Sequence, residues 1–278
     1  MKEIHMTILV TGATGTVGRH VVEQLVERGE RVRALTRNPG RASFPEGVEV
    51  VAGDLTVTAS LTAAFEGVTA AHLINCGGDD LAVLQNGKEI VDLAVASGVR
   101  RVTVLSAWDD GPLEPAVQAS SLEWTLVQPT EFMANALDWA QPIRESGEVR
   151  EPFAATKTAM IHEADIAAVI VTALTEDGHA GESYWLTGPE LLDIPEKLRL
   201  ISEATGREIR LVELTREQAR AEMLAAGASE EMIAFKFMVF GDLPWGPYTV
   251  MPTFEKVTGR PGRTFAQWAT ENADKFRA

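Results

Sequence analysis

Short apolar runs alternate with helical patterns over the first half of the chain. The runs that predict strands are Met6–Thr11, Arg31–Thr36, Val48–Ala52, Ala70–Asn75, Arg101–Leu105 and Trp124–Val127. Between them, residues 19–28 and 80–96 place apolar side chains at helical spacing, and Gly29 and Gly98 end these patterns. Strands that alternate with helices indicate βαβ units and a mainly parallel sheet. Such a sheet binds its ligands beyond the carboxyl ends of its strands.

The second half of the chain is less regular. Its patterns predict strands at 154–160, Ser183–Leu186 and Glu208–Glu213, and helices at 165–174, 195–204, 215–226, 229–240 and 264–275. We therefore predict an α/β fold with a Rossmann doubly wound parallel sheet at residues 1–150. A smaller C-terminal α/β substrate lobe is expected at residues 151–278, with segments that cross this boundary.

Composition narrows the classes of partner and compartment. The chain has 278 residues, 25 Lys+Arg and 40 Asp+Glu, and its net charge of −15 argues against nucleic acid and anionic membranes as partners. Neither a signal peptide nor an 18-residue apolar stretch is evident, so we expect a cytoplasmic protein, as a monomer or homodimer. The single cysteine cannot form an intramolecular disulfide, and the five histidines lack metal-ligand spacing, so no metal site is expected.

The strongest motif is the run Thr11-Gly12-Ala13-Thr14-Gly15-Thr16-Val17-Gly18 between the first strand and the first helix. Gly12 permits a tight turn, Gly15 lets the backbone approach a phosphate, and Gly18 lets the helix pack on the strand. The helix N-terminus then offers free N–H groups to a pyrophosphate. Residues predicted to bind a dinucleotide from this turn are Gly12, Thr14, Gly15, Thr16 and Val17.

The end of the second predicted strand indicates which dinucleotide is bound. Residues 31–41 contain four arginines and no carboxylate, whereas NAD sites usually place an acid here for the ribose 2′-hydroxyl. Arg37 can make a bidentate bond to a 2′-phosphate, so NADP(H) is preferred over NAD(H). A solvated basic turn is the alternative for Arg37.

Other strand ends supply the remaining cofactor candidates. Asp54 is expected either to accept from the adenine amino group or to cap a turn. Asn75 and Cys76 would border the adenosine ribose, although Cys76 also suits a small buried filler. The predicted cofactor set is completed by Leu55, Ser106, Ala107 and Pro129.

Several segments together resemble the NmrA-like branch of the atypical short-chain dehydrogenase/reductases. They are Thr11–Gly18, Arg37-Asn38-Pro39, Gly53-Asp54-Leu55, Asn86-Gly87, Leu105-Ser106-Ala107, Glu123–Pro129, Phe132–Asn135 and His162–Ala167. The resemblance covers about the whole chain. It implies a Rossmann fold, NADP(H) or NAD(H) as cofactor, and a small C-terminal lobe that covers the substrate.

The chain departs from orthodox short-chain reductases at the proton donor. Those enzymes use Tyr-x-x-x-Lys, but neither Tyr184 nor Tyr248 is followed by lysine four positions on. His162 is the preferred replacement acid because histidine titrates near neutrality, although it equally suits a structural role. Ser106 is the second catalytic candidate, and it could hydrogen-bond either the substrate carbonyl or the nicotinamide ribose. Other acids considered by position are Asp109, Asp110, Glu131 and Tyr248.

Three functions stay open at this point. We predict an NADPH-dependent reductase that transfers hydride to a ketone or quinone of an aromatic or polycyclic substrate, with substrate-assisted protonation. The alternatives are a non-catalytic NADP(H)-sensing regulator of the NmrA type, and a sugar or flavin-type oxidoreductase with an unrelated acid. Predicted substrate contacts are Trp108, Phe132, Met133 and Tyr248. The Met- and Phe-rich residues 223–240 suit either a cover over an apolar ligand or a core or dimer face.

Overall fold

The computed structural model describes residues 7–79, 81–106, 111–243 and 249–277, which form two compact units. Unit 1 comprises Met1–Pro129, Glu163–Leu186 and Thr253–Arg260, and unit 2 comprises Thr130–His162, Thr187–Pro252 and Pro261–Ala278. The chain passes between them after residues 129, 162, 186, 252 and 260, so three segments build each unit. No helix within the described residues is long and apolar enough to cross a lipid bilayer.

A seven-stranded parallel sheet forms the centre of unit 1. Its strands are β1 (Thr7–Val10), β2 (Arg31–Thr36), β3 (Glu49–Ala52), β4 (Ala70–Ile74), β7 (Arg101–Leu105), β8 (Glu123–Pro129) and β10 (Glu182–Leu186), in the order β10-β8-β7-β4-β1-β2-β3. Ile8 of β1 pairs with Val32 of β2 on one side and Ala70 of β4 on the other. The chain order therefore reverses between β1 and β4, which is where such sheets bind ligands.

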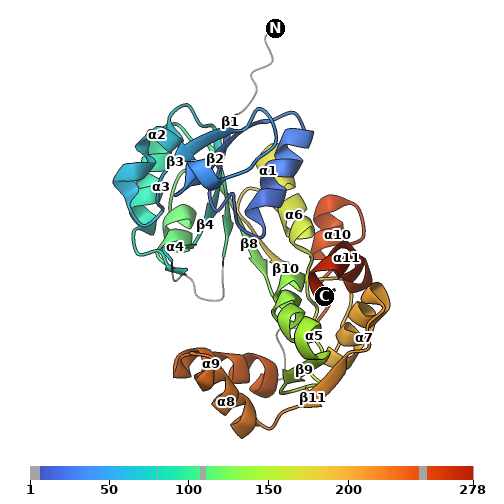
Figure 1. Ribbon diagram of the computed structural model, residues 1–278. Helices are drawn as coiled ribbons and strands as arrows, with labels where there is room; N and C mark the ends of the chain where they lie inside the picture. Colours follow the sequence, from blue (N-terminus) through green and yellow to red (C-terminus); the bar gives the residue numbers. More distant parts are fainter. Residues whose placement is uncertain (1–6, 80, 107–110, 244–248, 278) are drawn as a thin grey trace. The chain divides into compact units, whose positions relative to one another are not determined.

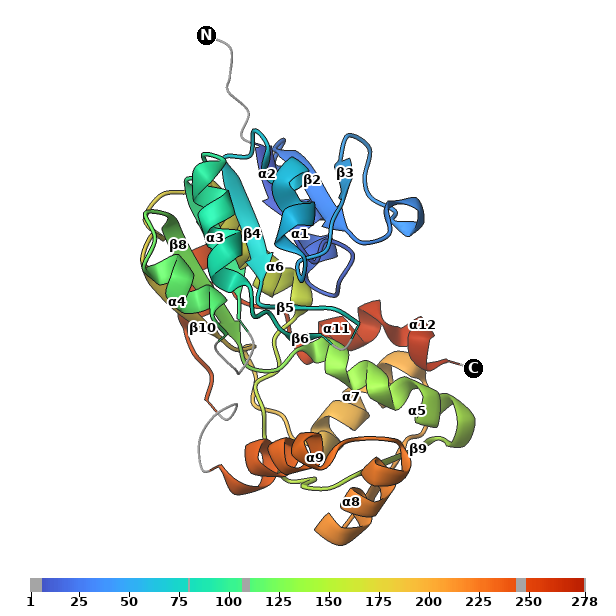
Figure 2. The same ribbon diagram turned by 90° about the vertical axis from the view of Figure 1, so that its left-hand side faces the viewer.

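Helices cover both faces of this sheet (Figures 1 and 2). One face carries α1 (Gly18–Glu27), α6 (Glu163–Thr175) and α10 (Thr253–Thr258); the other carries α2 (Thr62–Phe65), α3 (Gly87–Ala96) and α4 (Leu113–Gln118). Shorter elements are η1 (Pro39–Arg41), η2 (Thr58–Leu61) and the hairpin of β5 (Cys76–Gly77) and β6 (Ala82–Val83). Leu9, Phe65, Leu73 and Ile90 are fully buried beneath the second face. Burial of each such side chain contributes about 1.5–3 kcal/mol, which holds the strand ends in place.

Unit 2 combines helices with a two-stranded parallel sheet. Its elements are η3 (Met133–Trp139), α5 (Ala140–Ser146), β9 (Glu148–Glu151), α7 (Ile194–Thr205), β11 (Arg210–Glu213), α8 (Arg216–Ala225), α9 (Glu230–Phe237), η4 (Met238–Asp242), α11 (Phe265–Glu271) and α12 (Ala273–Phe276), with β9 paired to β11. Its core is centred on Phe265, Trp268 and Phe276. Capping boxes fix the start of α7, α8 and α11, since in each the cap side chain and the third helical residue bond reciprocally.

The predicted fold class is confirmed, and a few elements need correction. The helix expected over 80–96 begins only at Gly87, because Ala82–Val83 pairs with Cys76–Gly77 instead. The strand expected at 154–160 is wrong: this segment makes only an isolated bridge between Thr158 and Leu192. The helix expected over 264–275 divides into α11 and α12 at Asn272. Strand β9 was missed because charged residues stand at three of its four positions.

Candidate functional site

The glycine-rich turn after β1 leaves no room for side chains at two positions. Gly12 has φ +60°, which favours glycine, and a Cβ there would lie 2.9 Å from Ile74 Cδ1. A Cβ on Gly18 would lie 2.1 Å from the carbonyl oxygen of Gly12, which is backbone and cannot move aside. The amide of Gly15 donates to that same oxygen at 2.8 Å. The glycines therefore make a turn narrow enough for α1 to start directly against β1.

The N-terminus of α1 is open to an anion. Val17 precedes the helix without any side-chain capping bond, and the first turn carries no acidic residue. Thr14, Gly15 and Thr16 are exposed, so a ligand can reach the backbone here. The amides of Arg19 and His20 already donate to the carbonyls of Gly15 and Val17, so a phosphate is favoured here by the positive end of the helix dipole and by amides earlier in the turn.

Neighbouring strands hold this turn at the edge of the sheet. The amide of Thr11 donates to the carbonyl of His72 at 3.0 Å, and the amide of Ile74 donates to Thr11 Oγ1 at 3.1 Å. These bonds tie the end of β1 to the end of β4. The turn therefore lies at the reversal of strand order, the position at which dinucleotides bind in this architecture.

Arg37 follows β2 and makes one weak partnership. Its Nη1 donates to Asp79 Oδ1 at 2.6 Å, with the two side chains 44% and 98% exposed. An exposed pair of this kind contributes little, so the guanidinium remains available to a phosphate. Arg33 differs, because it pairs with Glu49 and donates to the carbonyls of Ala64 and Glu66. Arg33 is therefore structural, whereas Arg37 is the arginine at the strand end that can turn to a ligand.

Asp54 is already used in a local turn. Its Oδ1 accepts from the amide of Thr56 at 2.9 Å and from the Thr56 hydroxyl at 2.8 Å. These bonds stabilise the carboxylate and hold the pKa of Asp54 below its ordinary value. The turn-capping role is thus present, and the adenine contact stays a prediction. Leu55, beside it, is buried.

Asn75 and Cys76 follow β4. Asn75 Nδ2 donates to Glu114 Oε1 at 2.8 Å, and Glu114 Oε2 accepts from the amide of Gly111 at 3.1 Å. This buried network fixes the loop at the end of β4. Cys76 is half-buried, and burial raises the pKa of its thiol, so the protonated form is favoured.

Ser106 presents a buried hydroxyl with no hydrogen-bond partner among the described residues. It follows β7, is 3% exposed, and its amide donates to the carbonyl of Val127 at 3.0 Å. A buried hydroxyl without a partner is costly, so this atom fits a polar group of a bound ligand. Pro129 ends the adjacent strand β8. The predicted residues Ala107, Trp108 and Tyr248, and the acids Asp109 and Asp110, lie outside the described residues.

The predicted catalytic histidine lies in unit 2. His162 is 4% exposed, and its Nε2 lies 3.0 Å from Glu271 Oε2. One ring nitrogen is therefore engaged in a contact that a structural histidine would also make. Phe132 forms a bridge with Ile161, and Met133 is 1% exposed within the core of unit 2. The Met133 side chain therefore packs in the hydrophobic core of unit 2.

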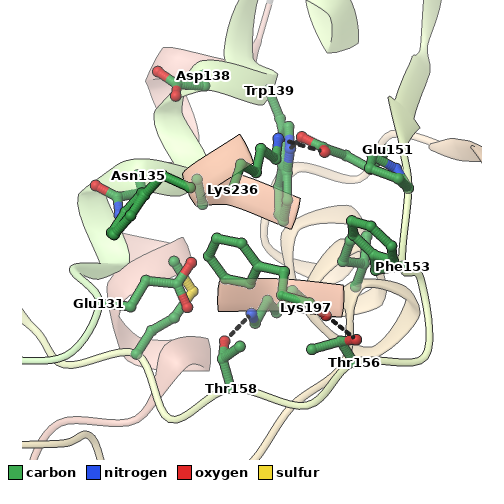
Figure 3. Close-up of a pocket in the computed structure, with 16 residues that line it drawn as sticks. Glu131, Asn135, Asp138, Trp139, Glu151, Phe153, Thr156, Thr158, Lys197 and Lys236 are labelled. Atoms are coloured by element: carbon green, nitrogen blue, oxygen red, sulfur yellow. Dashed lines mark hydrogen bonds and ion pairs between the residues drawn. The ribbon is translucent and has the colours of Figure 1, made fainter. Parts of the chain in front are cut away.

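A cavity of about 260 Å³ lies within unit 2 (Figure 3). Its lining is largely aromatic and aliphatic, with charged groups at a few points. Lining residues include Glu131, Trp139, Glu151, Phe153, Thr158, Met160, Ile194, Lys197, Phe235, Lys236 and Phe240. Phe235 and Phe240 of the predicted cover at 223–240 line the cavity, although Phe235 is also partly open to solvent, as are Met232 and Met238.

Lys197 is a functional candidate that the sequence analysis missed. It is 3% exposed, and its Nζ donates to Thr158 Oγ1 at 2.6 Å inside the cavity (Figure 3). Burial lowers the pKa of this amine, and the nearby carboxylates of Glu131, Asp193 and Glu151 oppose that shift. A signal was present in the sequence, because Lys197 stands on the apolar side of α7 with Ile194 and Ile201.

Comparison with known proteins identifies the family. Residues 12–115 match the NAD(P)H-binding protein family. The chain is 37% identical to an NAD(P)H azoreductase of Xenophilus azovorans over 98% of this chain and 99% of that one. It is 36% identical to the (4-alkanoyl-5-oxo-2,5-dihydrofuran-3-yl)methyl phosphate reductase of Streptomyces griseus subsp. griseus, over 97% and 99%. The chain belongs to the NmrA-like atypical short-chain dehydrogenase/reductases.

Solved structures share the fold of this NmrA-like protein. Triphenylmethane reductase of Citrobacter sp., complexed with NADP(H), has a TM-score of 0.78 at 22% identity, over 96% of this chain and 99% of that one. The negative transcriptional regulator NmrA in complex with NADP has a TM-score of 0.72 at 21% identity, over 96% and 95%. At these identities the similarity establishes the fold alone.

The reductase relatives assign the general activity. The NmrA-like protein is an NAD(P)H-dependent oxidoreductase that acts on a small molecule. Its residues fit the cofactor, because the turn offers an uncapped helix N-terminus and Ser106 offers a buried hydroxyl at the same edge of the sheet.

Proposed function

We propose that this NmrA-like protein is an NADPH-dependent reductase that transfers hydride to a ketone or quinone of an aromatic or polycyclic substrate. The observation that carries the cofactor choice is Arg37, which follows β2 where an NAD site would usually hold an acid. Its partner Asp79 is almost fully exposed, so exchanging it for a 2′-phosphate costs little.

Each part of the cofactor meets a different feature of unit 1. The amides of the turn from Gly12 to Val17 hold the pyrophosphate, and Arg37 holds the 2′-phosphate. Ser106 and Pro129 border the nicotinamide end of the sheet, where NADPH supplies hydride when bound. The Ser106 hydroxyl donates to the substrate carbonyl oxygen or to the ribose, because it has no protein partner within the described residues.

Protonation is proposed to come from the substrate or from water. A quinone, or a ketone beside a phenol, stabilises the alkoxide formed on reduction, so correct positioning supplies much of the acceleration. His162 remains the side-chain alternative, although its bond to Glu271 also suits a structural role. Two relatives that match over nearly their full length are reductases, which favours turnover over a purely regulatory function.

The cofactor choice is tested by titrating NADPH and NADH against intrinsic fluorescence. Arg37→Ala is expected to weaken NADPH binding by about tenfold or more and NADH binding by less than twofold, because only NADPH carries the 2′-phosphate. Arg31→Ala is the matched control, since Arg31 is an exposed arginine at the other end of β2. Equal losses for both cofactors would refute the role given to Arg37.

Turnover is tested by following NADPH oxidation with a panel of quinones and aromatic ketones. Oxidation of NADPH with at least one compound supports the reductase. Tight NADPH binding without any oxidation, together with capture of a defined partner protein, would favour the regulator instead. Full turnover in His162→Ala would remove that side chain from the proton-donor candidates.

A further inference from the structure

The cavity of unit 2 has the size and walls of a site for a small aromatic molecule. Its volume is about 260 Å³, against roughly 150 Å³ for a cavity that accepts benzene. Trp139, Phe153, Phe235 and Phe240 supply aromatic surface around it. A ligand of one or two fused rings therefore fills the space without moving the walls.

The buried amine of Lys197 points into this cavity with donors to spare. An ammonium group has three N–H donors, and the hydroxyl of Thr158 accepts one of them at 2.6 Å. Thr158 is itself held by two backbone bonds with Leu192, so the amine is fixed in place. Among the described residues, no second hydrogen bond of Lys197 is recorded. The site therefore requires an acceptor from a ligand or water.

Glu131 supplies the complementary acceptor (Figure 3). Its Oε2 is buried and has no hydrogen-bond partner in the described structure, although the carboxylate lines the same cavity as Lys197. The amide of Ile161 donates to the Glu131 carbonyl at 2.8 Å, which fixes this residue's backbone. In the described part of the chain Glu131 and Lys197 make no direct ion pair, although the Glu131 carboxylate is close enough to act on the charge of the Lys197 amine. One group that both accepts and donates can bridge the two side chains.

The balance of charge excludes an anion as the preferred ligand. Lys236 is neutralised by Glu151, whose other oxygen accepts from Trp139 Nε1 at 3.0 Å. The charges of Lys197 and Glu131 then offset each other, and the exposed carboxylate of Asp138 adds one more negative charge to the lining. A carboxylate or phosphate brought beside Glu131 has no further cation to neutralise it, and burying an unpaired charge is costly.

We propose that this cavity selects a neutral hydroxylated aromatic compound of one or two rings. The ligand hydroxyl accepts a hydrogen bond from Lys197 and donates one to Glu131, while the rings pack against the aromatic walls. The proposal deepens the proposed reductase function, on which it rests for taking the substrate to be a ketone or quinone that also carries a hydroxyl on its aromatic ring; a phenol without the carbonyl is then a non-reducible analogue.

The test compares three naphthalenes that differ in one substituent, on the full chain saturated with NADP⁺. They are 2-naphthol, its methyl isostere 2-methylnaphthalene, and the anion 2-naphthoate, measured by quenching of intrinsic tryptophan fluorescence. We expect 2-naphthol to bind about tenfold or more tightly than either of the others, since hydrogen bonds to charged groups are worth about 1.5–3 kcal/mol. Lys197→Met and Glu131→Leu should each remove that advantage and leave 2-methylnaphthalene within twofold of its original affinity.

Two further variants keep the outcome interpretable. Lys157→Met is the control, because Lys157 is exposed and pairs with Glu196 on the surface. Glu131→Gln should improve 2-naphthoate about fivefold by removing the like charge. The proposal is overturned if 2-naphthoate binds as tightly as 2-naphthol, or if both cavity variants weaken all three ligands alike. If the protein oxidises NADPH with quinones but does not prefer 2-naphthol over the other two ligands, only the inference about the cavity is rejected. If it prefers 2-naphthol but oxidises no NADPH, only the reductase function is rejected.

Discussion

The turn after β1 and the cavity of unit 2 are the two proposed binding regions, and they are made from different parts of the chain. The turn would bind through backbone amides supplied by consecutive residues, and its side chains matter chiefly by their absence at Gly12 and Gly18. The cavity would bind through side chains from several segments, among them Lys197 and Glu131. Adding a side chain to a glycine of the turn should therefore abolish binding there. Exchanging a side chain of the cavity should instead change which ligand is preferred.

The largest effect is expected from adding one methyl group to the turn. In Gly18→Ala the new Cβ would lie 2.1 Å from the Gly12 carbonyl oxygen, so α1 must shift away from β1. We expect a loss of about 3 kcal/mol in the free energy of unfolding, the upper range for overpacking, and loss of measurable NADPH binding. Urea unfolding and cofactor titration measure both. Gly40→Ala is the control, because nothing lies within 4 Å of its Cβ position; similar results for both variants would contradict the steric explanation.

Much of unit 1 could be predicted because its elements consist of residues that are consecutive in the chain. Its strands and the glycine turn are encoded by short consecutive patterns, and β2 and β7 have the predicted bounds. The helix expected over 80–96 was placed too early because Leu81 and Leu84 fit its spacing, but strand pairing at Ala82–Val83 takes precedence. Local periodicity cannot reveal a partner strand elsewhere in the chain.

Acid should weaken unit 1 through the imidazole of His72, a residue of β4 whose ring lies against the Thr103 hydroxyl and whose backbone carbonyl accepts from the Thr11 amide. His72 is fully buried, and burial lowers its pKa to about 3 from 6.5. Between pH 6.5 and pH 3, His72 is therefore protonated in the unfolded chain but neutral in the folded chain. The free energy of unfolding falls as the pH drops through this range. His72 lowers the free energy of unfolding by up to about 1.4 kcal/mol per pH unit in this range. The loss adds up to about 2 kcal/mol between pH 6.5 and pH 5.

The measurement is urea unfolding at pH 7 and pH 5. His72→Gln removes the titrating group and is expected to lower the loss of stability between these pH values, even if it is less stable at pH 7. His20→Gln is the control because His20 is more exposed and pairs with Glu23 on α1. An unchanged pH dependence in His72→Gln would show that His72 does not govern the acid response.

The buried charges of Lys197 and Glu131 are expected to lower the free energy of unfolding of the protein, although they would serve ligand binding. The double variant Lys197→Met/Glu131→Leu replaces both buried charges by apolar side chains, and such exchanges of a whole pair are often neutral or stabilising. We expect a gain of about 1 kcal/mol in the free energy of unfolding, together with lost discrimination for a hydroxylated ligand. Because the pKa of Lys197 is lowered from 10.5, the unfolded chain binds more protons at alkaline pH. Wild-type stability should therefore rise towards pH 10.5, and this rise should be smaller in the variant.

The cavity of unit 2 could not be predicted from the sequence, because its lining residues come together only in the folded chain. Glu131 was among the possible acids, but its place beside Lys197 depends on loops and helices that are distant along the chain. A lysine in a helix is ordinarily exposed, so its position on the apolar side of α7 was easily passed over. His162 drew attention by its chemistry, and its bond to Glu271 depends on a contact across 109 residues.

The smallest effect is expected where the turn region does use a side chain. Asp79 pairs with Arg37 and must release it when a 2′-phosphate binds, so Asp79→Ala should tighten NADPH binding. Both groups are exposed, and such pairs are worth about 0.2–1 kcal/mol, which corresponds to roughly 1.5- to fivefold in Kd. NADH should bind with unchanged affinity. The gain should shrink as salt is raised, because screening already weakens the competing pair. Titration at two salt concentrations decides it: weaker NADPH binding in Asp79→Ala would mean that Asp79 orients Arg37 towards the cofactor rather than competing with it.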